Sequence, residues 1–553
     1  MSSWNFADVW EVVAGLMGDR TATAHGGEHR SWTELNRRAD GVARWMLGLG
    51  VRPGETCAQY LYSSPPYLEA LFASFKLGIP PVNTNYRYGG DELRYLWDNA
   101  DTAAVVFHGS FSERVEALRS SLPRLRGYLW VDDGSGGCPG WADSYDEVIA
   151  GGGADHVRAP WGRTADDLYL LYTGGTTGSP KGVMWRQDDL FALLNRTAPV
   201  RYPEQGGLDD VRTMLVKPGP SVLPAAPLMH GTGMFCAMPI LSSGGTVVTL
   251  TGRSFSAVEF LDTVQAEGVK STAIVGDAFA RPILDALDAE PQRWDISSLR
   301  VVTSSGVMWS AAVKEGLLAH NPRLLLVDTL GSSEAIGMAS SISTSEGGRS
   351  TAAVDGPAGA ARAASFTLGP DTRVVTEDGL DVAPGSGQTG MVALRGRVPV
   401  GYWKDEKKSA QTFRVLDGQR WSIPGDFATV EADGTLRLLG RGSQCINTGG
   451  EKVYPEEVEE VLKTAPDVVD AVCVGTPDLR FGEAITALVE LRPGTVLNPD
   501  ALIAHVRAHL AHYKAPRHVF ELATVGRAPN GKVDYARLKA LAVDLSGSPP
   551  GPE

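Results

Sequence analysis

The chain has 553 residues, a formal net charge of −14 and an ordinary globular composition, with 43% hydrophobic and 21% charged residues. Such a length suggests several domains, and the acidic balance without a stripe of Lys and Arg argues against nucleic acid as a partner. The N-terminus carries acids among its apolar residues, and no apolar run is long enough for a bilayer, so we expect neither a secretory signal nor a membrane span. Five scattered cysteines without a C-x-x-C pair suit a reducing cytoplasm.

The first hundred residues contain two predicted helices. Ser31 and Glu34 form a capping-box pattern before apolar residues at helical spacing, and Gly50 closes that segment. A second apolar face at helical spacing lies within residues 63–78.

Between Gly245 and Gly337, short apolar strands alternate with helices. This alternation predicts a mostly parallel α/β sheet. Ligands bind beyond the carboxyl ends of such strands. We therefore expect a site beside the turns "GDAF", "TSSGVMW" and "TLGSSEA".

The pattern changes twice in the last third of the chain. From about Gly379, short strands punctuated by glycine predict a small β-rich subdomain. After Arg441, two helical patterns and two strand patterns predict a compact α+β unit. The predicted fold is α/β, with a large N-terminal domain of several subdomains over residues 1–441 and a small C-terminal domain over residues 442–553.

A glycine-rich stretch, "YTGGTTGSPKG" from Tyr172 to Gly182, follows an apolar strand. Glycines let backbone N–H groups approach a phosphate, hydroxyls add donors, and Lys181 adds positive charge. The ordinary phosphate loop reads G-x-x-x-x-G-K-[ST], but Gly182 follows the lysine here, so no hydroxyl stands beside it to hold magnesium. The pattern predicts an anion-binding loop of another kind, rather than a plain surface turn.

This stretch resembles the signature loop of the adenylate-forming enzymes, which include acyl-CoA synthetases, luciferases and peptide-synthetase adenylation domains. Further blocks resemble motifs of that family and stand in the family's order: "PLMHGTG" (227–233), "SSGVMWS" (304–310), "LGSSEA" (330–335), "VPVGYWKDEKKSAQTF" (398–413), "WSIPGDFA" (421–428), "GRGSQCINTGGEKVYPEEVEE" (440–460) and "PNGKVD" (529–534). Together they cover nearly the whole chain. Two of the blocks look most like actinobacterial acyl-CoA synthetases for fatty, sterol side-chain and terpenoid acids.

The resemblance implies an ATP site and its residues. Implied to bind cofactors are Thr173, Gly174, Gly175, Thr176, Thr177, Gly178, Lys181, Ser305, Gly306, Gly331, Ser332, Ser333, Asp426, Arg441, Gly449 and Gly450. Glu334 is implied to hold Mg²⁺, and Asp426 to accept both ribose hydroxyls. Lys532 is implied to bridge the acid and the α-phosphate, and His230 to belong to the acyl pocket.

The resemblance also implies two half-reactions. A carboxylate reacts with ATP to give acyl-AMP and pyrophosphate, which requires preorganised positive charge because the triphosphate repels the acid. The small C-terminal domain, implied to be mobile, then withdraws Lys532 and brings in Gly449 and Gly450 to line a narrow passage for pantetheine. The CoA thiol takes the acyl group and AMP leaves, so the implied cofactors are ATP, Mg²⁺ and coenzyme A.

Three residues depart from the family's pattern. Leu330 stands where the family often has a tyrosine that stacks on adenine, so we expect aliphatic packing there. Ser443 replaces a frequent hinge aspartate, and Asn447 replaces a frequent lysine. The chemistry of the domain hinge is therefore left open.

Rival functions explain fewer of the motifs. A hydrolase elbow G-x-S-x-G fails at Ala335, where the second glycine should stand. His505, His509 and His512 have ligand-like spacing on a predicted helix, but an apolar stripe runs beside them and no H-E-x-x-H pattern is present. A nucleotide-binding regulator without catalysis would not need both Lys532 and Glu334.

Within the family, amino-acid activation is disfavoured because the segment around "PLMHGTGMF" lacks an aspartate for an α-amino group. A luciferase-like oxygenase stays open, as does a ligase that loads the pantetheine arm of a carrier protein instead of CoA. A homodimer also stays open. The expected substrate is a large hydrophobic carboxylic acid, terpenoid before straight-chain fatty acid, because the pocket segment offers Ala, Gly and Met but no fixed charge.

Overall fold

The computed structural model describes residues 4–150, 156–175, 178–306, 309–345, 365–448, 451–478, 482–510, 512–528 and 531–547. They form two compact units. Unit one comprises Met1–Ile336, Thr344–Glu346 and Gly396–Arg414, and unit two comprises Gly337–Ser343, Gly347–Arg395 and Val415–Glu553. The division into domains at residue 441 stays a prediction.

One sheet of unit one is almost wholly parallel. Its strand order is β2 (Glu28–Ser31), β1 (Thr21–His25), β11 (Thr246–Thr249), β10 (Ser221–Pro224), β12 (Ser271–Ile274), β13 (Val301–Ser305) and β14 (Leu325–Ser332). Only β2 runs antiparallel to its neighbour. The predicted alternation of strands and helices is confirmed, and the turns after β12, β13 and β14 therefore share one edge of the sheet.

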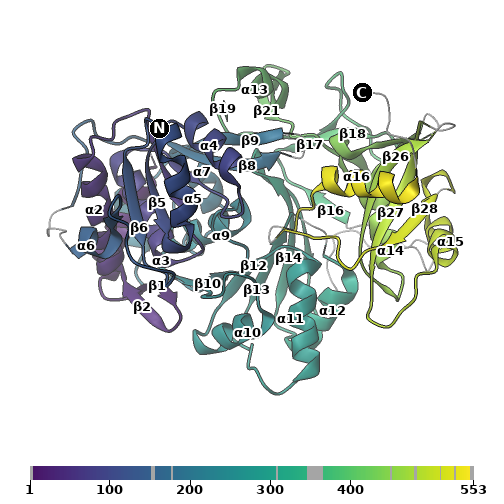
Figure 1. Cartoon of the computed structure of the whole chain (residues 1–553), viewed down its shortest axis with the longest axis horizontal. Helices are drawn as coiled ribbons and strands as arrows, with labels where there is room; N and C mark the ends of the chain where they lie inside the picture. Colours follow the sequence, from purple (N-terminus) through teal and green to yellow (C-terminus); the bar gives the residue numbers. More distant parts are fainter. Residues whose placement is uncertain are drawn as a thin grey trace. The chain divides into compact units, whose positions relative to one another are not determined.

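Helices connect these parallel strands. They are α9 (Gly231–Ser242), α10 (Ala257–Ala266), α11 (Asp277–Ala289) and α12 (Ala311–His320). Figure 1 shows α10, α11 and α12 next to strands β12, β13 and β14. Their apolar faces pack on the sheet in one core that includes Phe279, Trp309 and Leu326. Such packing of helices on a parallel sheet is the stable solution for alternating elements.

The second sheet of unit one carries the glycine-rich stretch. Its strand order is β19 (Gly401–Tyr402), β9 (Gly178–Arg186), β8 (Leu168–Gly175), β4 (Pro81–Asn83), β3 (Thr56–Tyr60), β5 (Thr102–His108), β6 (Gly127–Val131) and β7 (Asp143–Ser144). The strands from β8 to β7 run parallel, whereas β9 and β19 are antiparallel additions. Neighbouring helices are α4 (Gly90–Asn99), α5 (Ser112–Leu118), α6 (Tyr145–Ala150), α7 (Gln187–Asn195) and α13 (Glu406–Thr412).

Both helices predicted near the N-terminus are confirmed. Helix α2 (Trp32–Gly48) begins after Ser31, whose hydroxyl accepts from Glu34 N at 3.1 Å, while Glu34 Oε2 accepts from Ser31 N at 2.8 Å. Helix α3 (Pro65–Leu77) has proline in its first turn and is buried throughout. With α1 (Phe6–Met17) and α8 (Leu208–Met214), these helices share a core rich in aromatic rings.

Unit two begins with an antiparallel sheet. Its order is β15 (Ala335–Ser343), β16 (Ser365–Leu368), β23 (Leu436–Arg441), β22 (Asp426–Val430), β18 (Gly390–Arg395), β21 (Gln419–Ser422) and β20 (Phe413–Leu416), and β17 (Thr372–Val375) pairs with β18. This is the small β-rich subdomain that the sequence predicts. It places Asp426 at the start of a central strand.

The rest of unit two is an α+β arrangement, as predicted. Its sheet has the order β25 (Glu451–Val453), β24 (Ile446–Thr448), β27 (Gly482–Leu491) and β26 (Val468–Asp478), with β28 (His518–Glu521) beside β27. Helices α14 (Pro455–Lys463), α15 (Pro499–His509) and α16 (Tyr535–Ser546) cover it. The α/β class predicted from the sequence is confirmed.

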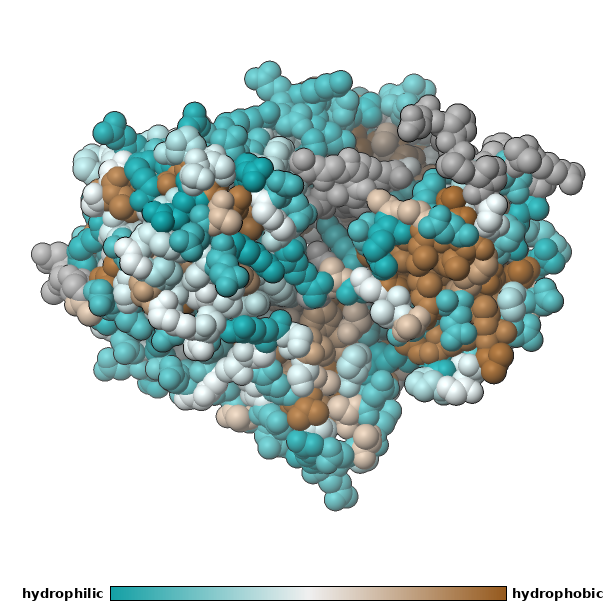
Figure 2. Space-filling view, viewed as in Figure 1, coloured by the Kyte–Doolittle hydropathy of each residue, from teal (hydrophilic) through white to brown (hydrophobic). Residues whose placement is uncertain are grey.

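Two surface properties follow from the composition. Within the described residues, no helix combines the length and the apolar character that a bilayer crossing requires. Hydrophilic residues cover much of the visible face of unit one in Figure 2, as expected for a chain of ordinary globular composition.

Candidate functional site

The glycine-rich stretch forms the end of a β-hairpin. Strands β8 and β9 pair antiparallel, with Thr173 opposite Lys181 and Gly175 opposite Gly178. The predicted residues Thr176 and Thr177 lie outside the described residues. A Cβ atom at Gly182 would stand 2.7 Å from the ring of Tyr172, so only glycine allows the two strands to pair this closely. This hairpin differs from a phosphate loop that leads directly into a helix.

Lys181 contacts a carboxylate and an aromatic ring. Its Nζ forms an ion pair with Asp405, and it lies 5.9 Å from the centroid of the Tyr402 ring. The hydrogen bond from Lys181 lowers the pKa of the Asp405 carboxyl, and the bond from Lys408 N lowers it further. The ammonium group of this hairpin is thus held by an acid from a distant part of the sequence.

Pairing of β19 with β9 brings that distant part to the hairpin. Tyr402 stands opposite Val183 in the register, and Trp403 N donates to Gly182 O at 2.8 Å. Asp405 then caps α13 by accepting from Lys408 N at 2.9 Å. The backbone therefore fixes both the phenol ring and the carboxylate beside Lys181.

Glu334 lies in the turn between β14 and β15, and Tyr402 reaches it. The phenol of Tyr402 donates to Glu334 Oε1 at 2.7 Å. Glu334 N donates to Ser332 Oγ at 3.3 Å, and Trp185 Nε1 donates to Ser333 O at 2.9 Å. Tyr402 thus contacts two residues from separate motifs: Lys181 lies over its ring, and Glu334 accepts from its hydroxyl.

The other predicted turn residues lie at the carboxyl edge of the parallel sheet. Ser305 is the last residue of β13 and pairs with Thr329 of β14, and Gly306 follows it. Gly331 and Ser332 end β14. The structure therefore brings Ser305, Gly306, Gly331, Ser332, Ser333 and Glu334 to one edge of the sheet, as the alternation predicts. Leu330, which departs from the family's pattern, is buried in β14.

His230 is the residue before α9, and its neighbour is tied to the hairpin strand. The buried Asn83 donates from Nδ2 to Tyr172 O at 2.8 Å and to Met229 O at 2.7 Å. Its Oδ1 accepts from Tyr172 N at 2.6 Å. One amide side chain therefore joins β8, which leads into the glycine-rich stretch, to the segment in which His230 lies.

Two further predicted residues, Asp426 and Arg441, stand opposite each other in unit two. They are register partners at the ends of β22 and β23, and Asp426 is buried. Ser443 and Asn447 follow, in a 3₁₀ turn and in β24. Gly449 and Gly450 lie outside the described residues.

Lys532 is close to a tight backbone turn that precedes α16. Ala528 N donates to Lys532 O at 2.7 Å, and Gly531 N donates to Ala528 O at 2.8 Å. Gly531 has a φ of 72°, a left-handed conformation that glycine adopts at little cost. The predicted lysine is thus carried on constrained backbone.

The three C-terminal histidines do not form one helical face. Helix α15 ends at His509, and His512 begins a separate 3₁₀ turn. His505 Nε2 bonds the Thr464 hydroxyl at 2.8 Å, and His509 Nδ1 bonds its own helix at His505 O. In the part of the chain that the structure describes, no group of three or more His, Cys, Asp or Glu side chains could hold a metal ion.

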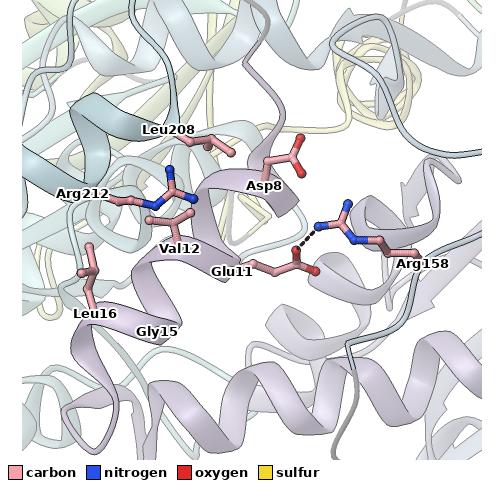
Figure 3. Close-up of a pocket in the computed structure, with 8 residues that line it drawn as sticks. All are labelled: Asp8, Glu11, Val12, Gly15, Leu16, Arg158, Leu208 and Arg212. Carbon is pink, nitrogen blue, oxygen red and sulfur yellow. Dashed lines mark hydrogen bonds and ion pairs between the residues drawn. The ribbon is translucent and has the colours of Figure 1, made fainter.

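A hollow of about 390 Å³ lies elsewhere on unit one and contains none of the predicted residues (Figure 3). Its lining residues are Asp8, Glu11, Val12, Gly15, Leu16, Arg158, Leu208 and Arg212. Figure 3 shows the ion pair between Glu11 and Arg158, whose atoms lie 3.4 Å apart. Glu11 also pairs with Lys76 at 2.9 Å and with Arg163 at 2.5 Å. This is a dense ion-pair cluster that joins α1 to α3.

Sequence reasoning did not nominate Tyr402, Asp405 or Asn83. Tyr402 and Asp405 lie within "VPVGYWKDEKKSAQTF", so the motif drew attention to them without giving them a role. Asn83 gives a weaker signal, a single amide at the end of the apolar strand β4. Only the folded chain brings these side chains to the predicted residues.

Two family models match the chain. A model described as AMP-binding enzyme matches residues 10–403, and one described as AMP-binding enzyme C-terminal domain matches residues 457–532. The 3-oxocholest-4-en-26-oate–CoA ligase of Rhodococcus rhodochrous is 38% identical over 576 residues, which cover 99% of this chain and 97% of that protein. The medium/long-chain-fatty-acid–CoA/3-oxocholest-4-en-26-oate–CoA ligase of Mycobacterium tuberculosis is 39% identical over 538 residues, with 96% of this chain and 95% of that protein covered.

Solved structures agree in fold. The anthranilate CoA ligase AuaEII in complex with anthranoyl-AMP superposes with a TM-score of 0.82 at 23% identity, covering 99% of each chain. The ATP-bound MatB of Rhodopseudomonas palustris superposes with a TM-score of 0.79 at 24% identity, covering 98% of this chain and 100% of that one. The sheets and helices described above therefore have the fold of these two structures.

Proposed function

Because the chain belongs to the family of AMP-binding enzymes, we propose that it is an ATP-dependent acyl-CoA synthetase. In this proposal it converts a large hydrophobic carboxylic acid to acyl-AMP and then to the CoA ester. The acid is of terpenoid, sterol-derived or fatty type. The names of the relatives that align over nearly the whole chain support a CoA ligase for such acids.

One observation carries the proposal, namely that Tyr402 links Lys181 to Glu334. The Lys181 ammonium lies 5.9 Å from the Tyr402 ring centroid, and the Tyr402 phenol donates to Glu334 Oε1. A cation beside a glycine-rich hairpin suits the β- and γ-phosphates. A carboxylate at the carboxyl edge of the parallel sheet suits a metal that those phosphates share. This combination supports a triphosphate with its metal as the ligand.

Magnesium fits Glu334 only in company with the triphosphate. Mg²⁺ in nucleotide sites is commonly bound through one or two carboxylates and substrate phosphates. The described residues contain no group of three or more ligating side chains, which agrees with that mode and not with a cage made by the protein alone. When bound, the ion would neutralise part of the charge on the triphosphate.

The first half-reaction joins the acid to the α-phosphate. The acid's carboxylate oxygen attacks the α-phosphorus, the bond to the β-phosphate oxygen breaks, and pyrophosphate leaves. We assign Lys532 to balance the charge of the acid and the α-phosphate, and Ser333 to donate to that phosphate. Asp426 and Arg441 hold the ribose, and the turns around Ser305, Gly306, Gly331 and Ser332 border the adenine and the acyl group.

The second half-reaction transfers the acyl group. The thiolate of CoA attacks the acyl carbon of acyl-AMP, the mixed anhydride breaks, and AMP leaves. Gly449 and Gly450 are assigned to the pantetheine passage. A carrier-protein phosphopantetheine is the second candidate acceptor, because it presents the same thiol arm.

The preference for a bulky apolar acid rests on the segment 225–238. It contains no Asp, Glu, Lys or Arg, and it begins α9 with Gly231 and Gly233. Phe235 and Cys236 are only partly buried there, so apolar surface borders the turn that holds His230. Met234 and Met238, whose side chains can adapt to irregular apolar shapes, are buried in the core of unit one. An uncharged, apolar segment favours volume over charge as the basis of selectivity.

A panel of acids tests the proposal. Fatty, sterol-derived, diterpenoid, aromatic and amino acids are compared by ATP–pyrophosphate exchange and by formation of the CoA ester. We expect strong exchange with bulky apolar acids and modest discrimination of about 1 to 3 kcal/mol per methylene group. Activity confined to small aryl or amino acids would overturn the substrate class. Failure of every acid in the panel to support pyrophosphate exchange would overturn the reaction class. A panel of carrier proteins with phosphopantetheine, compared with CoA, decides the acceptor.

The proposal also includes a cytoplasmic location. The five cysteines are all free, and two of them, Cys57 and Cys473, are buried. Unpaired thiols in such numbers suit a reducing compartment. Light emission with candidate luciferins would instead favour an oxygenase of the luciferase kind. Sedimentation of the full chain distinguishes a monomer from a homodimer.

A further inference from the structure

A half-buried arginine, Arg527, connects the Lys532 turn to the α+β sheet of unit two. Arg527 Nε and Nη2 donate to the Asp470 carboxylate at 2.5 and 3.0 Å. Its Nη1 donates to Gly531 O at 2.9 Å, and Nη2 also reaches Ala471 O at 3.4 Å. The guanidinium therefore bonds β26 on one side and the peptide before Lys532 on the other.

The geometry suits arginine better than any other side chain. A planar guanidinium can bind a carboxylate with two donors and still present a third donor at a fixed angle. Burial alone raises the pKa of Asp470, but the bonds from Arg527 and the charge of Lys463 lower it, so the carboxylate is held ionised. Lys463 Nζ lies 3.3 Å from the same carboxylate. The anchor is thus a charged network on β26 and α14, which are regular elements.

Backbone bonds carry this anchoring to Lys532. Gly531 O, which Arg527 holds, belongs to the peptide that joins Gly531 to Lys532. On the other side, Ala528 N donates to Lys532 O. Helix α16 begins three residues later, capped by Asp534, whose side chain accepts from Arg537 N at 2.9 Å. The backbone at Lys532 is therefore held from both directions.

We infer that Arg527, anchored by Asp470, is a positioning residue that sets the backbone of Lys532 for the adenylation half-reaction. The inference rests on the proposed function for the role of Lys532 in that step. A displacement of about 1 Å in a group that contacts the reacting atoms can cost about a hundredfold in rate. Loss of the bond to Gly531 O would allow such a displacement, while the sheet that Asp470 belongs to keeps its register.

The test compares half-reactions in the full-length chain. Arg527→Ala removes the bridge, and Arg527→Lys keeps a positive charge beside Asp470 without the planar fork. We expect acid-dependent pyrophosphate exchange to fall about 10- to 100-fold in Arg527→Ala and less in Arg527→Lys. Thioester formation from supplied acyl-AMP and CoA should stay within about twofold, because Lys532 is withdrawn in that step. A general loss of folding would reduce both half-reactions together.

A double variant separates positioning from an independent role. If Arg527 acts through Lys532, then Arg527→Ala combined with Lys532→Ala should exchange pyrophosphate no more slowly than Lys532→Ala alone. Arg492→Ala is the matched control, since Arg492 also donates to a backbone carbonyl, Pro466 O at 2.8 Å, but is exposed and elsewhere in unit two. It should leave both half-reactions unchanged.

Hydrogen exchange tests the structural part without any activity. Amide protection in peptides that span Ala528 to Lys532 should fall in Arg527→Ala and in Asp470→Asn, and not in Arg492→Ala. Unchanged protection in all three variants would overturn the inference. Equal loss of both half-reactions in an Arg527→Ala protein that remains folded would also overturn it, as would multiplied defects in the double variant. If none of the acids tested supported pyrophosphate exchange by the unmodified protein, the proposed function would be overturned instead. The protection data would still decide whether Arg527 holds the turn.

Discussion

Tyr402 and Glu334 are 68 residues apart in the chain, yet the phenol of Tyr402 donates a 2.7 Å hydrogen bond to Glu334 Oε1. Tyr402 is fixed by the pairing of β19 with β9, and Glu334 by the turn at the end of β14. The bond therefore orients a carboxylate on one sheet from a strand of the other. A metal ligand that is oriented in this way loses affinity when its partner is removed.

Tyr402→Phe should raise the Mg²⁺ concentration needed for half-maximal pyrophosphate exchange about 10- to 100-fold. The ring and its packing beside Phe413 stay in place, so only the hydrogen bond is lost. Titration of Mg²⁺ at saturating acid measures the effect. Tyr128→Phe is the control, because the buried Tyr128 phenol donates to a backbone carbonyl, Leu125 O at 2.8 Å. If Tyr402→Phe left the Mg²⁺ requirement unchanged, Glu334 would not be a ligand of the metal.

Asp405→Asn should lower the KM for ATP by about two- to fivefold. Asp405 forms an ion pair with Lys181, and both side chains are about one-third exposed, so the pair is worth at most about 1 kcal/mol. Removing the negative charge releases Lys181 for the triphosphate. Asparagine still caps α13, which keeps the local fold. Initial rates at varied ATP measure the change.

The same substitution has a salt signature. Because screening weakens exposed ion pairs, the difference in KM between the unmodified protein and Asp405→Asn should shrink as the ionic strength rises. A KM that rises in Asp405→Asn would instead mean that Asp405 orients Lys181 toward the phosphates.

Asp426→Ala should raise the KM for ATP on the order of a hundredfold and leave the KM for the acid nearly unchanged. A buried carboxylate that accepts two ribose hydroxyls contributes a few kcal/mol through charge-assisted hydrogen bonds. Steady-state kinetics with each substrate varied in turn make the measurement. Asp433→Ala is the control, since Asp433 lies in the turn at the other end of β22 and accepts only locally from Thr435. Equal KM values for ATP in Asp426→Ala and Asp433→Ala would show that Asp426 serves only the local turn and does not bind the ribose.

Glu11→Gln should destabilise unit one in a pH-dependent way. Burial alone raises the pKa of Glu11, but the hydrogen bonds and charges of Arg163 and Lys76 outweigh it and lower the pKa to about 2 from 4.5. A lowered pKa means that the carboxylate stabilises the folded state above about pH 4.5, and that this contribution disappears as the pH falls toward 2. At neutral pH the substitution should cost about 3 kcal/mol.

Urea unfolding at pH 7 and at several acidic pH values measures this cost. The difference between Glu11→Gln and the unmodified protein should narrow as the pH falls through the same window. Glu28→Gln, at an exposed position in β2, should change stability little at any pH. A cost of Glu11→Gln that does not depend on pH would point to packing instead of charge.

Much of the architecture is predictable from local patterns. The capping box at Ser31 and the strand–turn–helix rhythm from residue 271 each depend on neighbours within one or two turns of chain, so they appear in the sequence directly. The resemblance to adenylate-forming enzymes is confirmed by the family match. The similarity to actinobacterial synthetases for fatty and sterol side-chain acids agrees with the ligases of Rhodococcus and Mycobacterium.

The contacts within the site are not predictable in this way. Lys181 and Asp405 are 224 residues apart, and their meeting depends on the two-residue strand β19 joining the edge of the second sheet. Arg527 finds Asp470 across 57 residues because a loop returns to β26. No periodicity in the sequence encodes such pairings. Regular spacing can also suggest a contact that does not form. The spacing of His509 and His512 suggests one helix, but α15 ends at His509 and His512 begins a separate 3₁₀ turn.

Asn83 has a consequence for attempts to redirect this protein to new acids. Its one amide group holds both Tyr172, on the strand that enters the glycine-rich hairpin, and Met229, next to His230. If the segment 225–238 were exchanged for that of another ligase, the hydrogen bond from Asn83 would survive only if the new backbone placed a carbonyl where that of Met229 now lies. A transplanted segment that lost this hydrogen bond would be expected to change the affinity for ATP as well as the selectivity for the acid. Substrate engineering is therefore better confined to side chains that leave the Asn83 contacts intact.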